Sequence, residues 1–251
     1  MPVLQRADAE IYYEEFGSGY PLLLFAPGGL RSRIELWHSP AEAPARPWHD
    51  WTEKLASRYR VVAMDQRNAG RSLGAIAADH GWHTYAGDHL ALMDHLAHKR
   101  FHTLGGCIGS SFCLKLCEMA PARVSAAVLQ NPIGLNPQFP SYFPDSHTAW
   151  AKEQRAARPD LEAAALQSFA NNMWEQGFVF SVTRAFVRRC TVPCLVLPGD
   201  DTPPPAVIGA ELVELLPNAE ELNPWKGPQH LDAQGEAVID FLAKQTPKQW
   251  A

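Results

Sequence analysis

Short apolar runs alternate with amphipathic stretches along most of the chain, and this alternation constrains the fold more than any other feature. Residues 22–26 and 59–64 have the length and composition of buried strands. The stretches 85–98 and 108–119 carry apolar residues at helical spacing. Strands that alternate with helices need crossover connections, so the sequence predicts an α/β fold with a mostly parallel, twisted sheet and helices on both faces. The other predicted elements are strands 11–16, 101–106, 124–129, 194–197 and 221–222, and helices 48–58, 206–216 and 231–244.

The stretch 133–190 interrupts this alternation. It begins with a run rich in proline and aromatic residues and then becomes helix-like. A single crossover does not need so much chain, and the stretch is too short to bury much core by itself. We therefore expect residues 1–132 and 191–251 to form the core and 133–190 to form a helical cap over the strand ends; a small independent domain is the alternative. The predicted cap helices are 149–158, 161–173 and 178–188.

Composition excludes several classes of protein. The chain has 22 Lys and Arg against 27 Asp and Glu, a net charge of −5, so it has no basic surplus with which to bind nucleic acid. Its apolar runs are too short to span a membrane, and its first residues do not form a secretory signal. The five cysteines are an odd number without metal-site spacing, which predicts free thiols in a cytoplasmic protein and neither a metal nor a cofactor.

A cysteine stands at the junction between a predicted strand and a predicted helix. Cys107 has Gly105 two residues before it and Gly109 two residues after it, which is the spacing of a nucleophile elbow. Such a turn is so sharp that side chains at these two positions would clash. The N-terminal amides of the following helix favour an anionic sulfur. Ser110 and Ser111 lack the flanking glycines; the alternative for Cys107 is a small buried residue at a tight turn.

With this elbow the chain resembles the α/β-hydrolase fold family over nearly its full length. Residues 27–29 resemble the family's His-Gly-x segment, and 65–72 resemble its D-x-R-G-x-G-x-S turn. A strand followed by Gly-Asp and a late His before a terminal helix complete the ordered set. The chain departs from the family pattern at Cys107 in place of Ser, at Pro27 in place of His and at Asn68 in place of Gly.

The resemblance implies a base and an acid that follow the nucleophile in chain order. Of the ten histidines, only His230 follows the acid region, so it is the expected base. Asp200 and Asp201 both follow the predicted strand 194–197, and the spacing in relatives favours Asp201. Asp200 stays open as the alternative.

These residues imply a hydrolase that cleaves an ester, thioester or lactone through an acyl intermediate on Cys107. The expected oxyanion donors are the backbone N–H groups of Gly29 and Ile108. Trp150 and Trp174 are expected to line a pocket for a small, largely apolar acyl substrate, although they can instead pack the cap helices together. An acyltransferase and a non-catalytic ligand-binding module are the alternative functions. The oligomeric state is left open.

Overall fold

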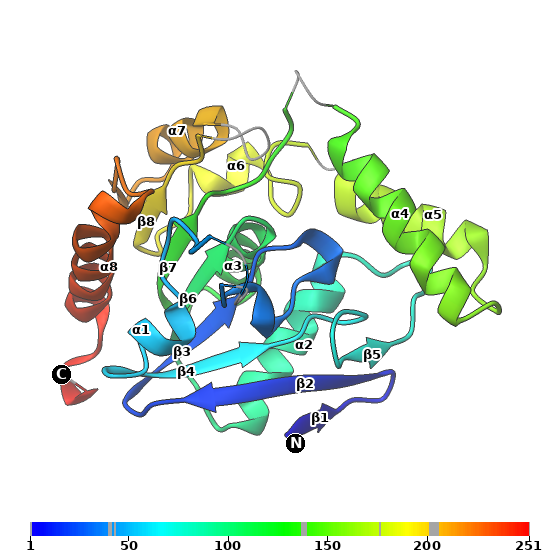
Figure 1. Ribbon diagram of the computed structural model, residues 1–251, viewed down its shortest axis with the longest axis horizontal. Helices are drawn as coiled ribbons and strands as arrows, with labels where there is room; N and C mark the ends of the chain where they lie inside the picture. Colours follow the sequence, from blue (N-terminus) through cyan, green and yellow to red (C-terminus); the bar gives the residue numbers. More distant parts are fainter. Residues whose placement is uncertain are drawn as a thin grey trace.

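The computed structural model describes residues 2–39, 42, 44–136, 140–175, 177–200 and 206–250. In this part of the chain nine strands form one twisted sheet at the centre of the molecule (Figure 1). The strands are β1 (Val3–Gln5), β2 (Ala9–Phe16), β3 (Tyr20–Phe25), β4 (Tyr59–Met64), β5 (Leu73–Gly74), β6 (Phe101–Gly106), β7 (Val124–Gln130), β8 (Cys194–Leu197) and β9 (Ala219–Glu221).

The strand order places β6 in the middle of the sheet. The order is β1-β2-β4-β3-β6-β7-β8-β9, and β5 pairs with β2. All pairings from β4 to β9 are parallel, whereas those of β2 are antiparallel. The predicted α/β fold is therefore confirmed. The carboxyl ends of the parallel strands meet at one edge, where such sheets bind ligands.

Helices cover both faces of the sheet because successive strand residues point to opposite sides. Leu23 and Phe25 pack in a cluster with α2, α3 and α7, whereas Leu22 and Leu24 pack in a second cluster with α1 and α8. The bounds are α1 (Trp51–Lys54), α2 (Trp82–His95), α3 (Ile108–Met119), α7 (Ala206–Leu215) and α8 (Leu231–Gln245).

The stretch 133–190 contains three helices among its described residues. They are α4 (Tyr142–Ala157), α5 (Ala163–Trp174) and α6 (Arg184–Val187). Figure 1 shows α4 and α5 side by side, at the opposite end of the molecule from α8. The division into core and cap stays a prediction.

Two predicted helices are much shorter in the structure. The predicted helix 178–188 is reduced to α6, because Phe178 and Phe180 have φ angles of 41° and 65° that cannot continue a right-handed helix. The Thr183 side chain accepts a hydrogen bond from the Phe186 N–H and so begins α6. The predicted helix 48–58 is reduced to α1, which begins after Asp50.

Polar contacts fasten the stretch 133–190 to the rest of the chain. The Arg31 guanidinium makes two hydrogen bonds to Glu153 on α4, of 3.0 and 2.8 Å. Ser111 on α3 donates to the Val179 carbonyl at 2.9 Å. These contacts hold α4 and the segment before α6 beside the carboxyl edge of the sheet. None of the described helices is long and apolar enough to cross a membrane.

Candidate active site

The backbone at Cys107 has an unusual conformation. Cys107 lies between β6 and α3 with φ 57° and ψ −116°. A non-glycine residue with positive φ is strained by about 1–3 kcal/mol, and such strain concentrates at functional sites. The chain therefore makes the sharp strand-to-helix turn that the glycine spacing predicts.

Close backbone packing explains the two glycines. A Cβ atom added to Gly105 would lie 2.1 Å from the carbonyl carbon of Gly109. A Cβ atom added to Gly109 would lie 2.6 Å from the carbonyl oxygen of Phe25, the last residue of β3. Both distances are far shorter than any real contact, so the turn excludes side chains at both positions.

The sulfur of Cys107 has two backbone donors and little contact with water. Burial raises the pKa of the thiol to about 11, although the N–H groups of Ile108 and Gly28 act in the opposite direction. The resting thiol is therefore neutral at physiological pH. This differs from the anionic sulfur expected at a helix N-terminus, because two N–H donors do not offset the cost of burying the charge.

The loop after β3 lies against the elbow. Gly28 and Gly29 have φ angles of 119° and 60°, and the 3₁₀ turn η1 (Gly29–Arg31) follows. A Cβ atom added to Gly106 would lie 2.8 Å from Cη2 of Trp37, so the indole of Trp37 covers the end of β6. A Cβ atom added to Gly29 would meet no described atom within 4 Å, so the backbone there borders open space.

The predicted oxyanion donors have different surroundings. The N–H of Ile108 points at the sulfur, and the second N–H at the sulfur belongs to Gly28 rather than to Gly29. The role of Gly29 and Ile108 as an oxyanion hole stays a prediction.

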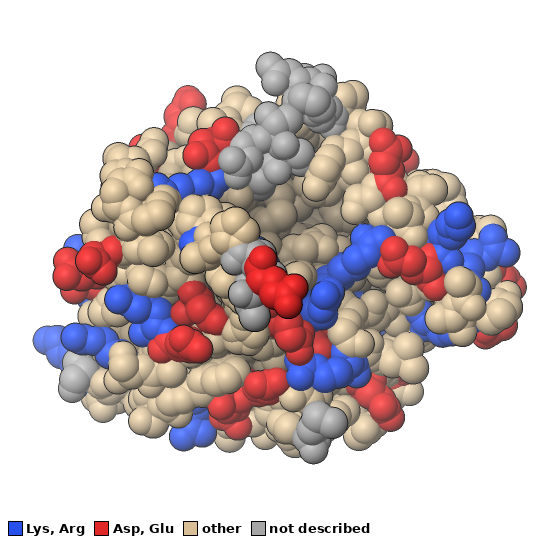
Figure 2. Space-filling model, viewed as in Figure 1, with Lys and Arg blue, Asp and Glu red and all other residues tan. Residues whose placement is uncertain are grey.

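Figure 2 shows that this face of the molecule is hollowed between the α4 region and the α6–α7 region.

The predicted base lies in a loop that is anchored by its neighbours. His230 ends the turn η3 (Pro228–His230), directly before α8. Trp225 Nε1 donates to the Pro198 carbonyl at 2.7 Å, and the Gly227 N–H donates to the Pro47 carbonyl at 3.0 Å. These bonds fix the course of the loop without engaging the imidazole.

The described part of the chain covers Cys107 and His230, two of the three residues of the predicted triad. Among the described residues, neither a hydrogen bond nor an ion pair joins His230 to Cys107 or to Asp200. The Asp200 carboxylate instead forms an ion pair with Lys226. Asp201, the predicted acid, lies outside the described residues. The assignment of Cys107, His230 and Asp201 as a triad stays a prediction.

A histidine–carboxylate pair does lie near the elbow, and sequence reasoning missed it. His38 Nδ1 forms a hydrogen bond with the Asp50 carboxylate. Burial opposes ionisation of Asp50, but hydrogen bonds from Thr52 and His38 outweigh it and hold the pKa of this carboxyl below its ordinary value. His38 and Asp50 are 12 residues apart in the sequence, and no motif or helical spacing connects them. Only the fold brings the two side chains together.

The neighbours of this pair contact the ends of the central strands. Trp37 covers Gly106 at the end of β6, and Trp51 Nε1 donates to Gln130 Oε1 at the end of β7 with a distance of 2.7 Å. His38 and Asp50 are each one residue away from these contacts. The pair therefore belongs to the wall around the elbow.

Trp150 and Trp174 are both buried; Trp150 packs within the stretch 133–190, and Trp174 also meets Trp82 on α2 with ring centroids 6.1 Å apart. Only 1% of Trp150 is exposed, and its ring centroid lies 5.6 Å from that of Phe169. The Trp174 ring stacks on Phe143 at 5.2 Å, and its Nε1 donates to His147 Nδ1 at 3.3 Å. The contacts with Phe169, Phe143 and His147 join α4 to α5. Contact of either indole with a substrate stays a prediction.

The described residues contain no group of three His, Cys, Asp or Glu side chains that is able to hold a metal ion.

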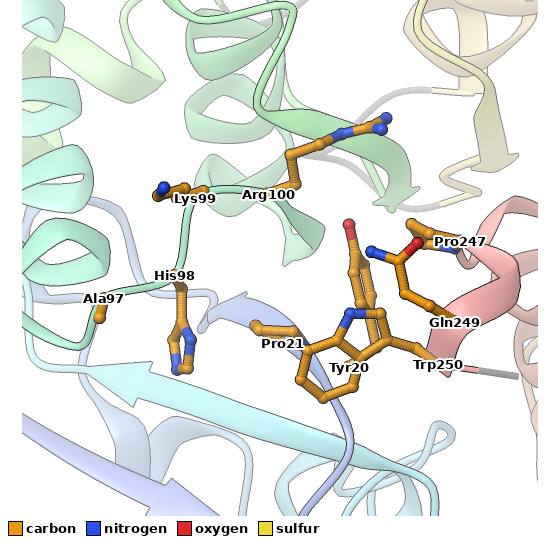
Figure 3. A pocket seen from close by; sticks show the side chains of 9 residues that line it. All are labelled: Tyr20, Pro21, Ala97, His98, Lys99, Arg100, Pro247, Gln249 and Trp250. Atoms are coloured by element: carbon orange, nitrogen blue, oxygen red, sulfur yellow. The ribbon is translucent and has the colours of Figure 1, made fainter.

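A separate pocket of about 320 Å³ lies at the opposite end of the strands, where Tyr20 begins β3 (Figure 3). Lys99, Arg100 and Trp250 line it. Because Phe25 at the other end of β3 contacts the elbow, this pocket is not part of the candidate active site.

Comparison with known proteins gives both a family and a fold. Residues 21–189 match the family model described as alpha/beta hydrolase fold. The chain is 30% identical over 131 residues to the protein named "Putative carbamate hydrolase RutD" of Azorhizobium caulinodans, which covers 52% of this chain and 44% of that protein. It is 25% identical over 274 residues to a non-heme haloperoxidase of Rhodococcus erythropolis, which covers 92% of this chain and 93% of that protein. The chain thus spans less than half the length of the first of these relatives.

Solved structures resemble the whole chain. An enol-lactonase from Burkholderia xenovorans LB400 has a TM-score of 0.67 at 20% identity, and the match covers 96% of this chain and 100% of that chain. A meta-cleavage product hydrolase from Pseudomonas fluorescens IP01 has a TM-score of 0.72 at 15% identity, covering 98% of each chain. At these identities the likeness shows the fold alone.

Proposed function

The chain belongs to the alpha/beta hydrolase fold family, and from this membership and the geometry at Cys107 we propose that it hydrolyses acyl compounds through an acyl intermediate on that cysteine. The observation that carries the proposal is the strained backbone of Cys107, with φ 57°, at the end of the central strand β6. Strain at one nucleophilic residue beside two backbone donors is the arrangement that acyl transfer requires. The names of relatives include a carbamate hydrolase and an enol-lactonase, which are both acyl hydrolases.

In the proposed first half-reaction, Cys107 attacks the acyl carbon. The thiol proton passes to the imidazole of His230 as the S–C bond forms, and the carbonyl oxygen gains the negative charge. The N–H groups of Ile108 and Gly29 donate to this oxygen; one such donor is typically worth about 3–4 kcal/mol. The bond from carbon to the leaving group then breaks, and His230 returns the proton to the leaving group.

In the proposed second half-reaction, water cleaves the thioester. His230 takes a proton from water, and the resulting hydroxide attacks the acyl carbon. The C–S bond breaks, the acid product leaves, and His230 returns the proton to the sulfur. Asp201 would orient the imidazole and stabilise its cationic form. A neutral resting thiol agrees with this sequence of steps, because the base takes the proton only during the attack.

The test is to look for the acyl intermediate itself. The wild-type chain, Cys107→Ala and Cys107→Ser are incubated with para-nitrophenyl acetate and with the matching thioester. Released product and the intact mass of the protein are then followed together. We expect an acetyl adduct on Cys107 in the wild-type chain, and a loss of kcat/KM of about 10⁴-fold or more in Cys107→Ala.

The outcomes separate the alternative functions. Turnover that persists in a folded Cys107→Ala variant would contradict the proposal. An adduct that leaves Cys107 only when an amine or thiol is added would show an acyltransferase. Binding of the ester without any adduct in the wild-type chain would show a ligand-binding module. Thermal melting of all three chains confirms that they are folded alike.

A further inference from the structure

The segment 47–51 lies between the loop that precedes α8 and the carboxyl end of β7. At one end of the segment, the Pro47 carbonyl accepts a hydrogen bond from the Gly227 N–H at 3.0 Å. At the other end, Trp51 Nε1 donates to Gln130 Oε1 at 2.7 Å. One short segment therefore contacts both the loop of the predicted base and the strand beside the elbow.

The side chain of His49, in the middle of this segment, contacts the residue that follows the predicted base. His49 Nε2 lies 2.7 Å from the carbonyl oxygen of Leu231, the first residue of α8. Because a carbonyl oxygen only accepts, Nε2 carries the hydrogen and donates it. The backbone N–H of His49 also donates to Oε1 of Gln234, at 3.3 Å. The segment 47–51 thus holds the chain on both sides of His230, at Gly227 before it and at Leu231 after it.

The surface of α8 leaves room for the imidazole of His49. A Cβ atom added to Gly235 would lie 2.8 Å from Nε2 of His49, so a larger residue at this position would displace the ring. The ring also packs edge-on against the indole of Trp51, with centroids 5.3 Å apart. Burial lowers the pKa of His49 below its ordinary value, so at neutral pH the ring is neutral and directs its single N–H at Leu231.

The contacts of the segment 47–51 continue to the proposed nucleophile. The side chain of Gln130 accepts from Trp51, and its backbone carbonyl accepts from the Cys107 N–H at 2.9 Å. His49 packs on Trp51, so a connected path of contacts runs from the first residue of α8 to the elbow. Proton transfer depends steeply on such placement, because a displacement of about 1 Å can cost about 10²-fold in rate.

We propose that His49 is a positioning residue for the predicted base: by holding the Leu231 carbonyl it fixes where α8 begins, and so keeps the imidazole of His230 within reach of Cys107. This inference rests on the proposed function, in which His230 exchanges a proton with Cys107. His49 takes no proton in this role and acts only through His230. A histidine that merely stabilised the fold would affect activity whether or not His230 were present.

A double-mutant cycle between His49 and His230 tests the proposal. The value of kcat/KM for para-nitrophenyl acetate is measured in the wild-type chain, His49→Ala, His230→Ala and the double variant, after subtraction of the rate of the Cys107→Ala chain. His49→Gln is the conservative variant, because its side-chain N–H₂ group can donate to the same carbonyl. His49→Phe keeps the packing on Trp51 without a donor, and it takes the place of His49→Ala if that chain fails to fold. Thermal melting compares the folding of all the variants.

We expect His49→Ala to lower kcat by about tenfold or more, with KM within about twofold of the wild-type value, because substrate binding does not involve this residue. His49→Phe should lose as much, whereas His49→Gln should stay within about threefold of wild type. In the His230→Ala background, replacement of His49 should change kcat/KM by less than about twofold, because no base is left to position.

Two results would overturn the inference while leaving the proposed function in place. One is a loss of equal size with and without His230, which would give His49 a structural role. The other is a wild-type kcat in a folded His49→Ala or His49→Phe chain. The proposed function fails in different arms of the same experiment: unchanged activity of His230→Ala, or a rate in Cys107→Ala equal to that of wild type, would overturn it together with the inference.

Discussion

The elbow at Cys107 and the loop that carries His230 differ in how the chain places them. At the elbow, backbone atoms pack against backbone atoms, and a Cβ added to Gly105 would lie 2.1 Å from the carbonyl carbon of Gly109. The loop of His230 is held from outside, by Trp225 on the Pro198 carbonyl and by Gly227 on the Pro47 carbonyl. The proposed nucleophile is therefore positioned by local packing, and the predicted base by contacts between segments far apart in the sequence.

The largest expected effect is on kcat/KM, when His230 and His38 are each replaced by alanine. His230→Ala should lower kcat/KM by about 10²–10⁴-fold, because it removes the proposed base. His38→Ala removes the histidine paired with Asp50 and should change kcat/KM by less than about threefold, because this pair is not assigned to proton transfer. Steady-state kinetics of the two folded variants make the measurement. The reverse pattern would move the base from the loop before α8 to the wall around the elbow.

A smaller effect is expected on the free energy of unfolding, when Gly105 and Gly87 are each replaced by alanine. Gly105→Ala places a methyl group 2.1 Å from a backbone carbon and should lower the free energy of unfolding by about 3 kcal/mol or more. Gly87→Ala lies within α2, where the nearest atom would be 3.9 Å away, and should raise the free energy of unfolding by about 0.5–1 kcal/mol. Urea unfolding of both variants makes the comparison. Equal stability of the two would mean that the elbow is not closely packed.

The smallest expected effect is on the pH dependence with which the Cys107 sulfur reacts. Because burial raises the pKa of Cys107 to about 11, the wild-type chain at neutral pH should hold about a hundred times less thiolate than an ordinary cysteine. Alkylation of Cys107 by iodoacetamide should therefore accelerate as pH rises, with a midpoint above 9. Peptide mapping after timed alkylation measures this midpoint. A midpoint below 7 would show that an imidazolium pairs with the sulfur in the resting protein.

Three strands of the parallel sheet could be predicted from the sequence to the residue, whereas the predicted strands 22–26 and 124–129 differ by one or two residues at an end from β3 and β7. The predicted strands 59–64, 101–106 and 194–197 coincide with β4, β6 and β8. Each is a short apolar run that ends at a charged residue, a glycine or a proline, so local composition defines both ends. Prediction failed at 178–188, because left-handed backbone at Phe178 and Phe180 has no signal in residue type.

The candidate site could be predicted only where its signal is local. The glycines around Cys107 carry the elbow in a spacing of five residues, and the structure explains both of them. The pairing of His38 with Asp50 and the contact of His49 with Leu231 depend on which segments meet in space, so no spacing reveals them. The predicted base and acid rest on chain order alone, and the ion pair of Asp200 with Lys226 shows how a loop side chain takes a partner that chain order does not specify.

The exposure of the cysteines has a practical consequence. Cys107 is half-buried, whereas Cys113, Cys117, Cys190 and Cys194 are buried. Because the Cys107 sulfur itself has little contact with water, a small alkylating reagent at high pH should reach it first, ahead of the four buried cysteines. The same order of reaction would allow a small label to be attached at Cys107 without first replacing the other four cysteines.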